Sequence, residues 1–431
     1  MKVHVATYGC SANQSSSEIM MAAIRNMGHE LVEEADAEVV VCNTCTVKAA
    51  TEQKILHQIH KLGQQGVEVV VAGCMPQVQL DTILQRNPDA HILGVNSIGH
   101  IGDMLHTIGQ MRTGDMPDDR LQTMDDLPTG FLNMARQRFN PNIHICQISQ
   151  GCNYHCAYCI VTIARGKLRS FDADSIVVDI RSAVEEGCGE IWLTSQDNAQ
   201  YGTDGDVRLP ELLEKIVSIP GDYKVRVGMM NPFSVRPILD SLLDVFESDK
   251  IYKIVHLPIQ SASDAVLHRM DRYHSISEVN HIIDRFRQRY HDLTLFTDVI
   301  VAFPGETDED FKQTLKWVEQ YQPDKVNISR YTPRPLTKAR EYRNIDSRIV
   351  GQRSGELHRL CDAIKLENKK TMIGWKGRVF VSKNASVRGV MARTDSYRPV
   401  VIPQSEGLCP GQHCMVEITD TTPGYFLGKV I

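Results

Sequence analysis

Apolar and polar residues follow one repeating pattern over the first 108 residues. Short apolar runs, as expected for buried strands, are each followed by a longer stretch with the spacing of an amphipathic helix. The runs and their helical stretches lie at residues 3–8 and 18–27, 38–41 and 48–62, and 67–72 and 78–85. Alternating strands and helices are typical of a parallel α/β sheet, so we expect a Rossmann- or flavodoxin-like N-terminal domain.

A second series of strands and helices begins with a strand near residue 144. The helices and strands that follow are predicted at residues 175–186 and 190–194, 209–219 and 224–228, 235–247 and 251–257, 277–289 and 294–303, and 308–321 and 325–331. This series is too short for a full eight-stranded barrel and predicts a partial (βα)6 barrel. In parallel barrels the chemistry lies at the carboxyl ends of the strands.

Two segments break this pattern. Residues 109–142 have little periodic apolar sequence and contain Gly114, Pro117 and Pro128, which favours a connector. After a basic helical stretch that ends near Lys370, the tail changes to short β runs separated by Gly, Pro and Asn. These runs lie at residues 379–382, 400–402, 415–418 and 426–430. They predict a small C-terminal β-barrel.

The composition is that of a globular chain with more than one domain. At 431 residues the chain exceeds what one core ordinarily supports. No apolar run approaches the roughly 18 residues that a membrane span needs, and the first residues lack a signal pattern. The 12 cysteines, in a chain without an export signal, favour metal or catalytic thiols in a reducing compartment. We therefore expect a cytoplasmic protein with no membrane partner.

The net charge of −6 is unevenly distributed. Residues 328–431 carry 18 Lys and Arg against 9 Asp and Glu, a net charge of +9, which leaves −15 for residues 1–327. A basic end on an acidic chain suits a module that binds a polyanion, although ordinary solvated charge has the same pattern. Arg393, Tyr397 and Arg398 lie together in the tail and are candidate nucleic-acid contacts, with ordinary surface as the alternative.

The clearest candidate site is the loop of residues 151–159, which contains Cys152, Cys156 and Cys159. Three thiols at this spacing can hold one soft metal group and leave a position open for a substrate, which favours a site-differentiated iron–sulfur cluster. A structural zinc site fits less well because the usual second pair of ligands is missing and His155 lies inside the loop. Buried free cysteines fit poorly, since the loop is polar and flanked by Gly and Asn.

A second set of cysteines follows the predicted N-terminal strands. Cys10, Cys45 and Cys74 each come after one of these strands. Because the carboxyl ends of parallel strands share one edge of a sheet, we expect these thiols to meet and to hold a second cluster. Cys42 forms a C-x-x-C pair with Cys45, but it continues an apolar run. We therefore interpret Cys42 as a buried strand residue rather than as part of a redox pair.

The cysteine loop, with an aromatic residue directly before its last cysteine, resembles the cluster loop of the radical S-adenosylmethionine (SAM) enzymes. The resemblance implies that Cys152, Cys156 and Cys159 hold a 4Fe–4S cluster whose open iron binds SAM, which is cleaved to a 5′-deoxyadenosyl radical. It places Tyr158 beside the adenine. Polar clusters also stand at the predicted strand ends, where this family binds SAM. The SAM contacts implied there are Gln196, Asp197 and Gln260.

The order of the parts resembles the methylthiotransferases along nearly the whole chain, and within them the archaeal and eukaryotic tRNA branch. The motifs that carry the resemblance lie at residues 43–48, 73–77, 228–232 and 257–264, and the tail motif at residues 393–399 is similar to a TRAM domain. The implied domains are residues 1–110 with the auxiliary cluster cysteines, a connector at 111–141, a radical SAM domain at 142–370 and a TRAM tRNA-binding domain at 371–431.

That branch converts N6-threonylcarbamoyladenosine beside the tRNA anticodon to its 2-methylthio derivative. The resemblance implies two 4Fe–4S clusters and two SAM molecules, because an adenine carbon that no base can activate needs a radical. The cluster of Cys10, Cys45 and Cys74 would hold the sulfur that is methylated and transferred. The resemblance also implies a tRNA partner, contacted at Arg393, Tyr397 and Arg398, and a low-potential one-electron donor similar to ferredoxin or flavodoxin.

Other interpretations stay open on the sequence alone. A methylthiotransferase could act on isopentenyladenosine in tRNA or on a ribosomal-protein aspartate, although the second should have a more acidic tail. A non-enzymatic iron–sulfur or RNA-binding protein would leave the polar strand ends unexplained. The chain departs from the family at Ala302 and Leu336, where Gly is usual, which bears on the geometry of those loops and not on the reaction. The cysteines for which we predict structural roles are Cys146, Cys188, Cys361, Cys409 and Cys414.

Overall fold

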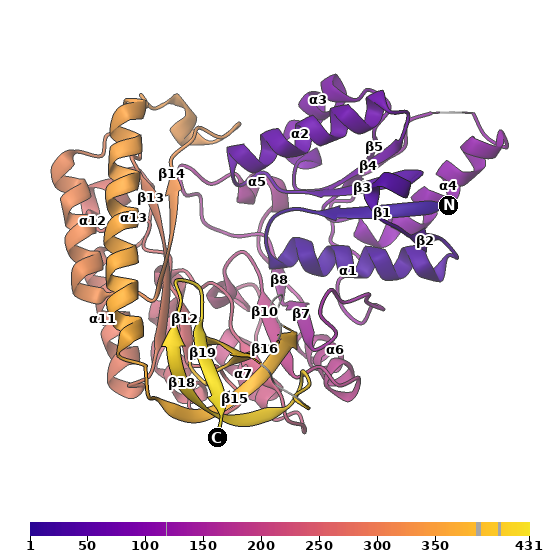
Figure 1. Ribbon diagram of the computed structural model, residues 1–431. Coiled ribbons are helices and arrows are strands. Elements are labelled where there is room, and N and C mark those ends of the chain that lie inside the picture. Colours follow the sequence, from indigo (N-terminus) through magenta and orange to yellow (C-terminus); the bar gives the residue numbers. More distant parts are fainter. Residues whose placement is uncertain (118, 385–388, 404–406) are drawn as a thin grey trace. The chain divides into compact units, whose positions relative to one another are not determined.

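The computed structural model describes residues 1–117, 119–384, 389–403 and 407–431, and the chain folds into two compact units (Figure 1). The first unit comprises Met1–Phe139, Ile145–Asp179 and Thr332–Arg340, and the second comprises Asn140–His144, Ile180–Tyr331 and Glu341–Ile431. Both sets of candidate cluster cysteines fall in the first unit. Within the described ranges, no helix is both long enough and apolar enough to cross a membrane.

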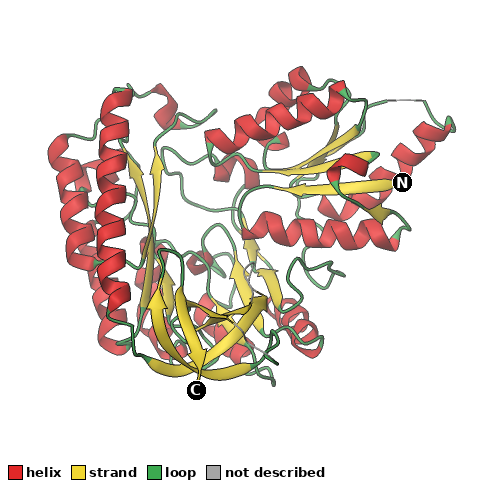
Figure 2. Ribbon diagram, in the orientation of Figure 1, coloured by secondary structure: helices red, strands yellow, loops and turns green. Residues whose placement is uncertain are grey.

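The first unit is built on a sheet with the strand order β2-β1-β3-β4-β5-β6. Its strands are β1 (Lys2–Thr7), β2 (Glu30–Leu31), β3 (Val39–Thr44), β4 (Glu68–Gly73), β5 (His91–Gly94) and β6 (Gln122–Thr123). Every adjacent pair is parallel, and helices lie on both faces of the sheet (Figure 2). The predicted parallel α/β class of the N-terminal domain is thus confirmed.

Alternate residues of the strands enter two separate cores, because successive side chains of a strand point to opposite faces. The covering helices are α1 (Ser11–Asn26), α2 (Ala49–Gln64), α3 (Pro76–Arg86) and α4 (Ile101–Thr113). Val39 and Val41 pack with α1 and α4, whereas Val40 and Cys42 pack with α2 and α3. Cys42 is fully buried, which confirms that it is a core residue of its strand.

The second unit contains the later strands of the second predicted series. They are β10 (Glu190–Thr194), β11 (Lys224–Arg226), β12 (Ile254–His256), β13 (Thr294–Val301) and β14 (Lys325–Arg330), and β7 (Ile143–Gln147) precedes them. The intervening helices include α6 (Ala173–Glu185), α7 (Leu209–Val217), α9 (Leu239–Val245), α11 (Ile276–Arg289) and α12 (Asp308–Tyr321). Strand β10 pairs with β11, and β13 pairs with β12 and β14, always in parallel. This alternation agrees with the predicted (βα)6 class.

The tail closes into a small barrel in the same unit. Across its described residues the strand order is β15-β16-β17-β19-β18. The strands are β15 (Lys376–Asn384), β16 (Gly389–Arg393), β17 (Pro399–Pro403), β18 (His413–Thr421) and β19 (Phe426–Val430), and helix α13 (Ser347–Lys370) leads into them. The predicted barrel is confirmed. Strand β16 was not predicted, although Val390, Met391 and Ala392 form an apolar run as long as that of residues 400–402.

Candidate active site

Three neighbouring strands bring Cys10, Cys45 and Cys74 to one edge of the N-terminal sheet. Strands β1, β3 and β4 are adjacent and in register, with Thr44 opposite Gly73. Burial, with smaller contributions from Cys74 and Cys10, raises the pKa of the Cys45 thiol to about 11. The three thiols are therefore close enough to interact electrostatically, and we call them the auxiliary site.

Glycines allow the chain to turn tightly at this edge. Gly9 has φ +107°, and a Cβ added to it would lie 2.7 Å from Cβ of Cys45. Gly73 has φ +86°, and a Cβ there would lie 2.6 Å from the carbonyl oxygen of Thr44. Since only glycine adopts such conformations at little cost and leaves this space free, the glycine before Cys10 and the glycine before Cys74 bring the two turns close together.

A buried hydrogen-bond network fixes the turns that carry the auxiliary site. The Asn13 side chain donates from Nδ2 to the carbonyl oxygens of Tyr8 (2.7 Å) and Thr44 (2.8 Å). Asn43 donates in turn to the carbonyl of Asn13 at 2.8 Å. Thr44 Oγ1 donates to the carbonyl of Ala72 at 2.6 Å. These side chains tie each strand end to its neighbour, and of the three only Asn13 lies outside the sequence motifs.

The second set of cysteines lies on a loop that a short hairpin closes. Strand β8 (Ser149–Gln150) pairs with β9 (Arg169–Ser170) in antiparallel fashion, and the loop runs between them. Gly151 has φ +82°, and a Cβ on it would lie 2.1 Å from the carbonyl oxygen of Lys167. The loop can therefore leave β8 only at a glycine.

Cys152, Cys156 and Cys159 are partly buried in this loop, and we call them the loop site. The amide of Cys159 donates to the carbonyl of Cys156 at 2.9 Å. Burial, followed by the charges of Cys156 and Cys152, raises the pKa of the Cys159 thiol to about 12. A thiol with such a high pKa stays protonated near neutral pH unless it binds a metal, which displaces the proton. The amide of Ala339 donates to the carbonyl of Ala157 at 2.8 Å and holds the middle of the loop.

The predicted SAM contacts have different environments. Asp197 is buried in the second unit, and its carboxylate accepts hydrogen bonds from the amide of Asn231 (2.9 Å), from Ser234 (2.5 Å) and from Gln200 (3.0 Å). Burial raises the pKa of Asp197, whereas these hydrogen bonds lower it, and the net direction is upward. The carboxylate therefore joins the ends of β10 and β11, and its contact with SAM stays a prediction.

Gln260, Gln196 and Tyr158 are partly buried and keep their predicted roles as predictions. Gln260 has φ +65°, which is uncommon for a residue with a side chain. Its backbone is held on both sides, because its amide donates to the carbonyl of Asp298 at 2.8 Å and its carbonyl accepts from the amide of Ile300 at 2.9 Å. Strained residues held in this way often occur at ligand sites.

A further polar group lies on the second-unit strands. His256 Nε2 is 2.6 Å from Oδ2 of Asp298, and Asn327 donates to Oδ1 of Asp298 at 2.9 Å. Burial raises the pKa of Asp298, but the hydrogen bond and charge of His256 outweigh it, so the pKa lies below its usual value. The residues come from β12, β13 and β14, and only their alternation along the strands could have indicated them.

The predicted tRNA contacts have partners inside the second unit. Tyr397 is 6% exposed and packs edge-on against Tyr252, with ring centroids 4.9 Å apart. The guanidinium of Arg393 lies 4.0 Å from the centroid of the Tyr397 ring. Arg398 forms an ion pair with Asp292. These contacts attach the barrel to the rest of its unit, and contact of the same residues with tRNA stays a prediction.

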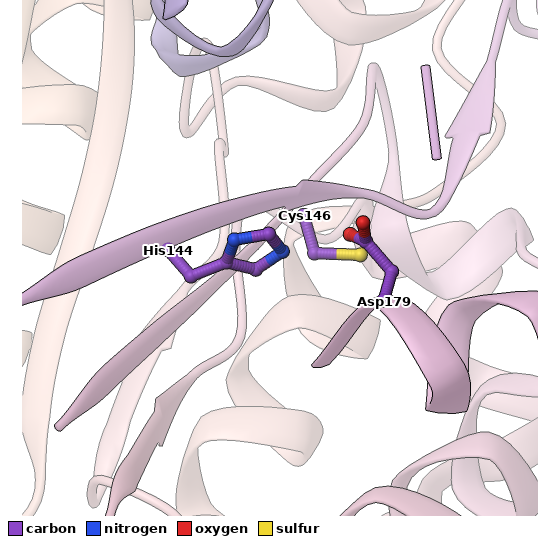
Figure 3. A group of neighbouring side chains, drawn as sticks. All are labelled: His144, Cys146 and Asp179. Atoms are coloured by element: carbon purple, nitrogen blue, oxygen red, sulfur yellow. The ribbon is translucent and has the colours of Figure 1, made fainter. Parts of the chain in front are cut away.

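Cys146 lies in a buried polar cluster away from both cysteine sites. Figure 3 shows His144 and Cys146 projecting from β7 beside Asp179 of α6, and their potential ligand atoms lie within 4.8 Å of one another. Asp179 already accepts from the amide of Asn133 at 2.8 Å and pairs with Arg136 at 3.6 Å. Because Arg136 supplies the positive charge that a metal would bring, the arrangement agrees with the structural role predicted for Cys146.

Two family models match parts of this chain. Residues 2–94 match the uncharacterized protein family UPF0004, and residues 146–318 match the radical SAM superfamily. A Pyrococcus abyssi protein named probable threonylcarbamoyladenosine tRNA methylthiotransferase is 38% identical over 100% of both chains. The Homo sapiens threonylcarbamoyladenosine tRNA methylthiotransferase is 30% identical over 100% of this chain and 74% of its own length.

Among solved structures, the radical SAM methyltransferase TsrM of Kitasatospora setae is similar with a TM-score of 0.58 and 13% identity, over 79% of this chain and 76% of that one. At that identity the likeness shows the fold alone. The match that covers the cysteine loop defines the class of protein, a radical SAM enzyme. The full-length relatives then place the chain in the family of the threonylcarbamoyladenosine tRNA methylthiotransferases.

Proposed function

We propose that this enzyme converts N6-threonylcarbamoyladenosine in tRNA to its 2-methylthio derivative. The observation that carries the proposal is the presence of two three-thiol sites in one compact unit, in a chain that full-length relatives of that name match at 30–38% identity. A second site for sulfur is what methylthio transfer requires.

The donor sets fit two 4Fe–4S clusters. Each set offers three cysteine thiols that form no disulfide, on turns that contain glycines, and three thiolate ligands leave one iron open to a ligand that is not protein. Cys152, Cys156 and Cys159 would hold the cluster that binds SAM, and Cys10, Cys45 and Cys74 would hold the second. When bound, these cofactors would supply the radical that takes the hydrogen atom from the adenine carbon, giving 5′-deoxyadenosine, and the methylated sulfur that replaces that hydrogen.

The chain's own residues orient these groups. We assign Tyr158, Gln196, Asp197 and Gln260 to the binding of the SAM adenine, ribose and amino-acid groups. The bonds to Asp197 keep the ends of β10 and β11 together, so this carboxylate also positions its neighbours. The proposal includes a cytoplasmic location and a ferredoxin- or flavodoxin-like electron donor, because SAM cleavage calls for a low reduction potential.

The C-terminal barrel is the proposed tRNA-binding module. Besides Arg393, Tyr397 and Arg398, it carries cations that are far more accessible: the side chains of Lys376, Arg378 and Lys429 are 60%, 59% and 61% exposed. Exposed cations bind phosphate oxygens without reading sequence. We therefore assign the phosphate contacts to these three residues and propose that the partly buried group contributes mainly at its exposed atoms.

The experiment is mass spectrometry of tRNA nucleosides from cells that lack the protein, before and after its return. The proposal expects loss and recovery of the methylthio group on threonylcarbamoyladenosine, and no recovery with a Cys74→Ala variant expressed at the same level. Loss of methylthio groups from isopentenyladenosine would indicate the related tRNA substrate. No change in any methylthio nucleoside would overturn the tRNA assignment and favour a ribosomal-protein aspartate.

A further inference from the structure

Arg165 is a buried cation between the two cysteine sites. It ends helix α5 (Val161–Arg165), which begins two residues after Cys159, and it is 5% exposed. The preceding residue, Ala164, packs against Cys74 and Val95. The segment that leaves the loop site therefore runs directly along the auxiliary site.

The guanidinium of Arg165 is only partly satisfied. Its Nη2 donates to Oδ1 of Asn13 at 2.7 Å, whereas Nη1 is buried and has no hydrogen-bond partner among the described residues. No carboxylate forms an ion pair with it in the described part of the chain. A buried charge is costly unless it is paired, and among the described residues the only anions that could pair with this guanidinium are those of the neighbouring cysteine site.

The groups that do face Arg165 belong to the auxiliary site. Cys74 is within hydrogen-bond reach, and Cys10 and Cys45 are further electrostatic neighbours. Asn13 is itself fixed, because its amide nitrogen already donates to the carbonyls of Tyr8 and Thr44. The side-chain oxygen of Asn13 therefore points to Arg165 and accepts from its Nη2, which holds the guanidinium in one orientation. In this orientation Nη1 donates no hydrogen bond to a described residue.

We propose that Arg165 is the anion-binding residue of the auxiliary site, where its Nη1 donates a hydrogen bond to the anionic sulfur, of the hydrosulfide or thiolate class, that this site holds for transfer. The inference rests on the proposed function, since it presumes a second cluster. Three thiolates repel a fourth anionic sulfur, and a guanidinium with a free donor offsets that repulsion at the position where the sulfur binds. Arg165 is a positioning residue here and takes no part in bond making.

The test uses the full-length chain with Cys152, Cys156 and Cys159 replaced by Ala, so that only the auxiliary site can hold iron. In this background, sodium sulfide is titrated into the anaerobically reconstituted protein, and binding is followed by the electron paramagnetic resonance spectrum. Arg165→Gln removes the charge, Arg165→Lys keeps it without the planar fork, and Lys167→Gln removes an exposed cation from the same segment as the matched control.

We expect Arg165→Gln to keep its iron and to bind hydrosulfide at least about ten-fold more weakly, the effect of losing one charge-assisted hydrogen bond. Arg165→Lys should lie between this variant and the parent, and Lys167→Gln should match the parent. The midpoint potential should fall in Arg165→Gln, because a nearby positive charge favours the reduced cluster.

Unchanged hydrosulfide affinity in Arg165→Gln would overturn the inference. If Arg165→Gln loses its iron, the hydrosulfide affinity of Arg165→Lys becomes the test. An affinity equal to that of the parent would then overturn the inference. A parent protein that holds no iron in this background would instead contradict the second cluster, and with it the proposed function. The two failures are therefore distinguishable.

Discussion

Ala302 and Leu336 are among the described residues with side chains that adopt a backbone conformation that glycine prefers. Ala302 has φ +61° and Leu336 has φ +62°. These are the two positions at which the sequence departs from the glycine usual in the family it resembles. The chain therefore keeps the path of the two loops and accepts strain, of roughly 1–2 kcal/mol for each residue.

Replacing Ala302 by Gly should raise the free energy of unfolding. The gain should be about 1 kcal/mol, because the relief of left-handed strain exceeds the entropy that glycine adds to the unfolded chain. Denaturant unfolding of the purified protein measures this change in the free energy of unfolding. Ala183→Gly, in the interior of helix α6, is the control and should lower the same quantity by about 1 kcal/mol. A loss of stability in Ala302→Gly would contradict the interpretation.

Gly151→Ala should disrupt the loop site. The added Cβ would lie 2.1 Å from a carbonyl oxygen of the chain, so β8 and the loop must move apart. We expect reconstituted protein to lose the iron of one site and to retain that of the other, measured by iron and sulfide analysis. Gly114→Ala is the matched control, since Gly114 also has positive φ, +82°, but nothing lies within 4 Å of the added Cβ. Full iron content in Gly151→Ala would refute the argument.

At this scale the sequence indicated the proposed ligands better than the residues that support them. The six cysteines could be predicted because spacing and strand ends are local features of the chain. Asn13 and Arg165 could not, because their hydrogen bond joins residues 152 positions apart. No local sequence pattern distinguishes a buried arginine from a surface one. Only the fold shows that Asn13 is the partner of Arg165.

Among the elements, helix α1 shows where hydrophobic pattern fails. The apolar pattern placed its start near residue 18, but the helix begins at Ser11. Its first turns are rich in serine, and several of these serines are buried. Ser16 donates to the carbonyl of Ala12 at 3.0 Å, and Thr7 donates to Ser17 at 2.7 Å. Polar side chains that satisfy each other can be buried without an apolar signal.

The sequence predicted strands β1, β3 and β4 of the N-terminal sheet and missed β2, β5 and β6. Residues 109–142 have no apolar period, yet Phe131 is buried in the core beside α1, and the amide of Phe139 donates to the carboxylate of Glu18 at 3.1 Å. Such a segment is ordered by single contacts with distant residues. Its course could not be read from periodicity, which detects only regular elements.

The barrel separates residues that attach it from residues that face solvent. Arg398 pairs with Asp292 and, at 3.4 Å, with Asp324, whereas Lys376 is exposed and lies 4.0 Å from Glu417. We expect Arg398→Ala to lower the free energy of unfolding by about 1–3 kcal/mol, because two carboxylates lose their partner. Lys376→Ala should change it by less than about 1 kcal/mol.

Binding of tRNA should show the opposite order. Lys376→Ala should weaken affinity and reduce its dependence on salt, since one phosphate contact is lost. At a temperature where the Arg398→Ala variant is folded, its affinity for tRNA should fall less than that of Lys376→Ala. Thermal unfolding and filter binding of the two variants give both quantities. If Arg398→Ala weakened tRNA binding more than Lys376→Ala and left stability unchanged, Arg398 would be a tRNA contact and not an anchor.

For the whole molecule, the arrangement of the cysteines matters most. Both three-thiol sites lie in the first unit, although residues of the second series of elements supply one of them. Helix α5 connects them, since it follows the loop site along the chain and packs on Cys74. We therefore propose that the two sites are joined in structure and separate in role, one for SAM cleavage and one for sulfur.

The separate roles of the two sites can be tested with the purified enzyme. Purified, reconstituted protein is given SAM, a reductant, sulfide and tRNA that carries threonylcarbamoyladenosine, and both 5′-deoxyadenosine and the methylthio nucleoside are quantified by mass spectrometry. Replacing Cys10, Cys45 and Cys74 by Ala should keep 5′-deoxyadenosine formation and abolish the methylthio product. Replacing Cys152, Cys156 and Cys159 should abolish both. Methylthio product from the first variant, or SAM cleavage by the second, would contradict the account.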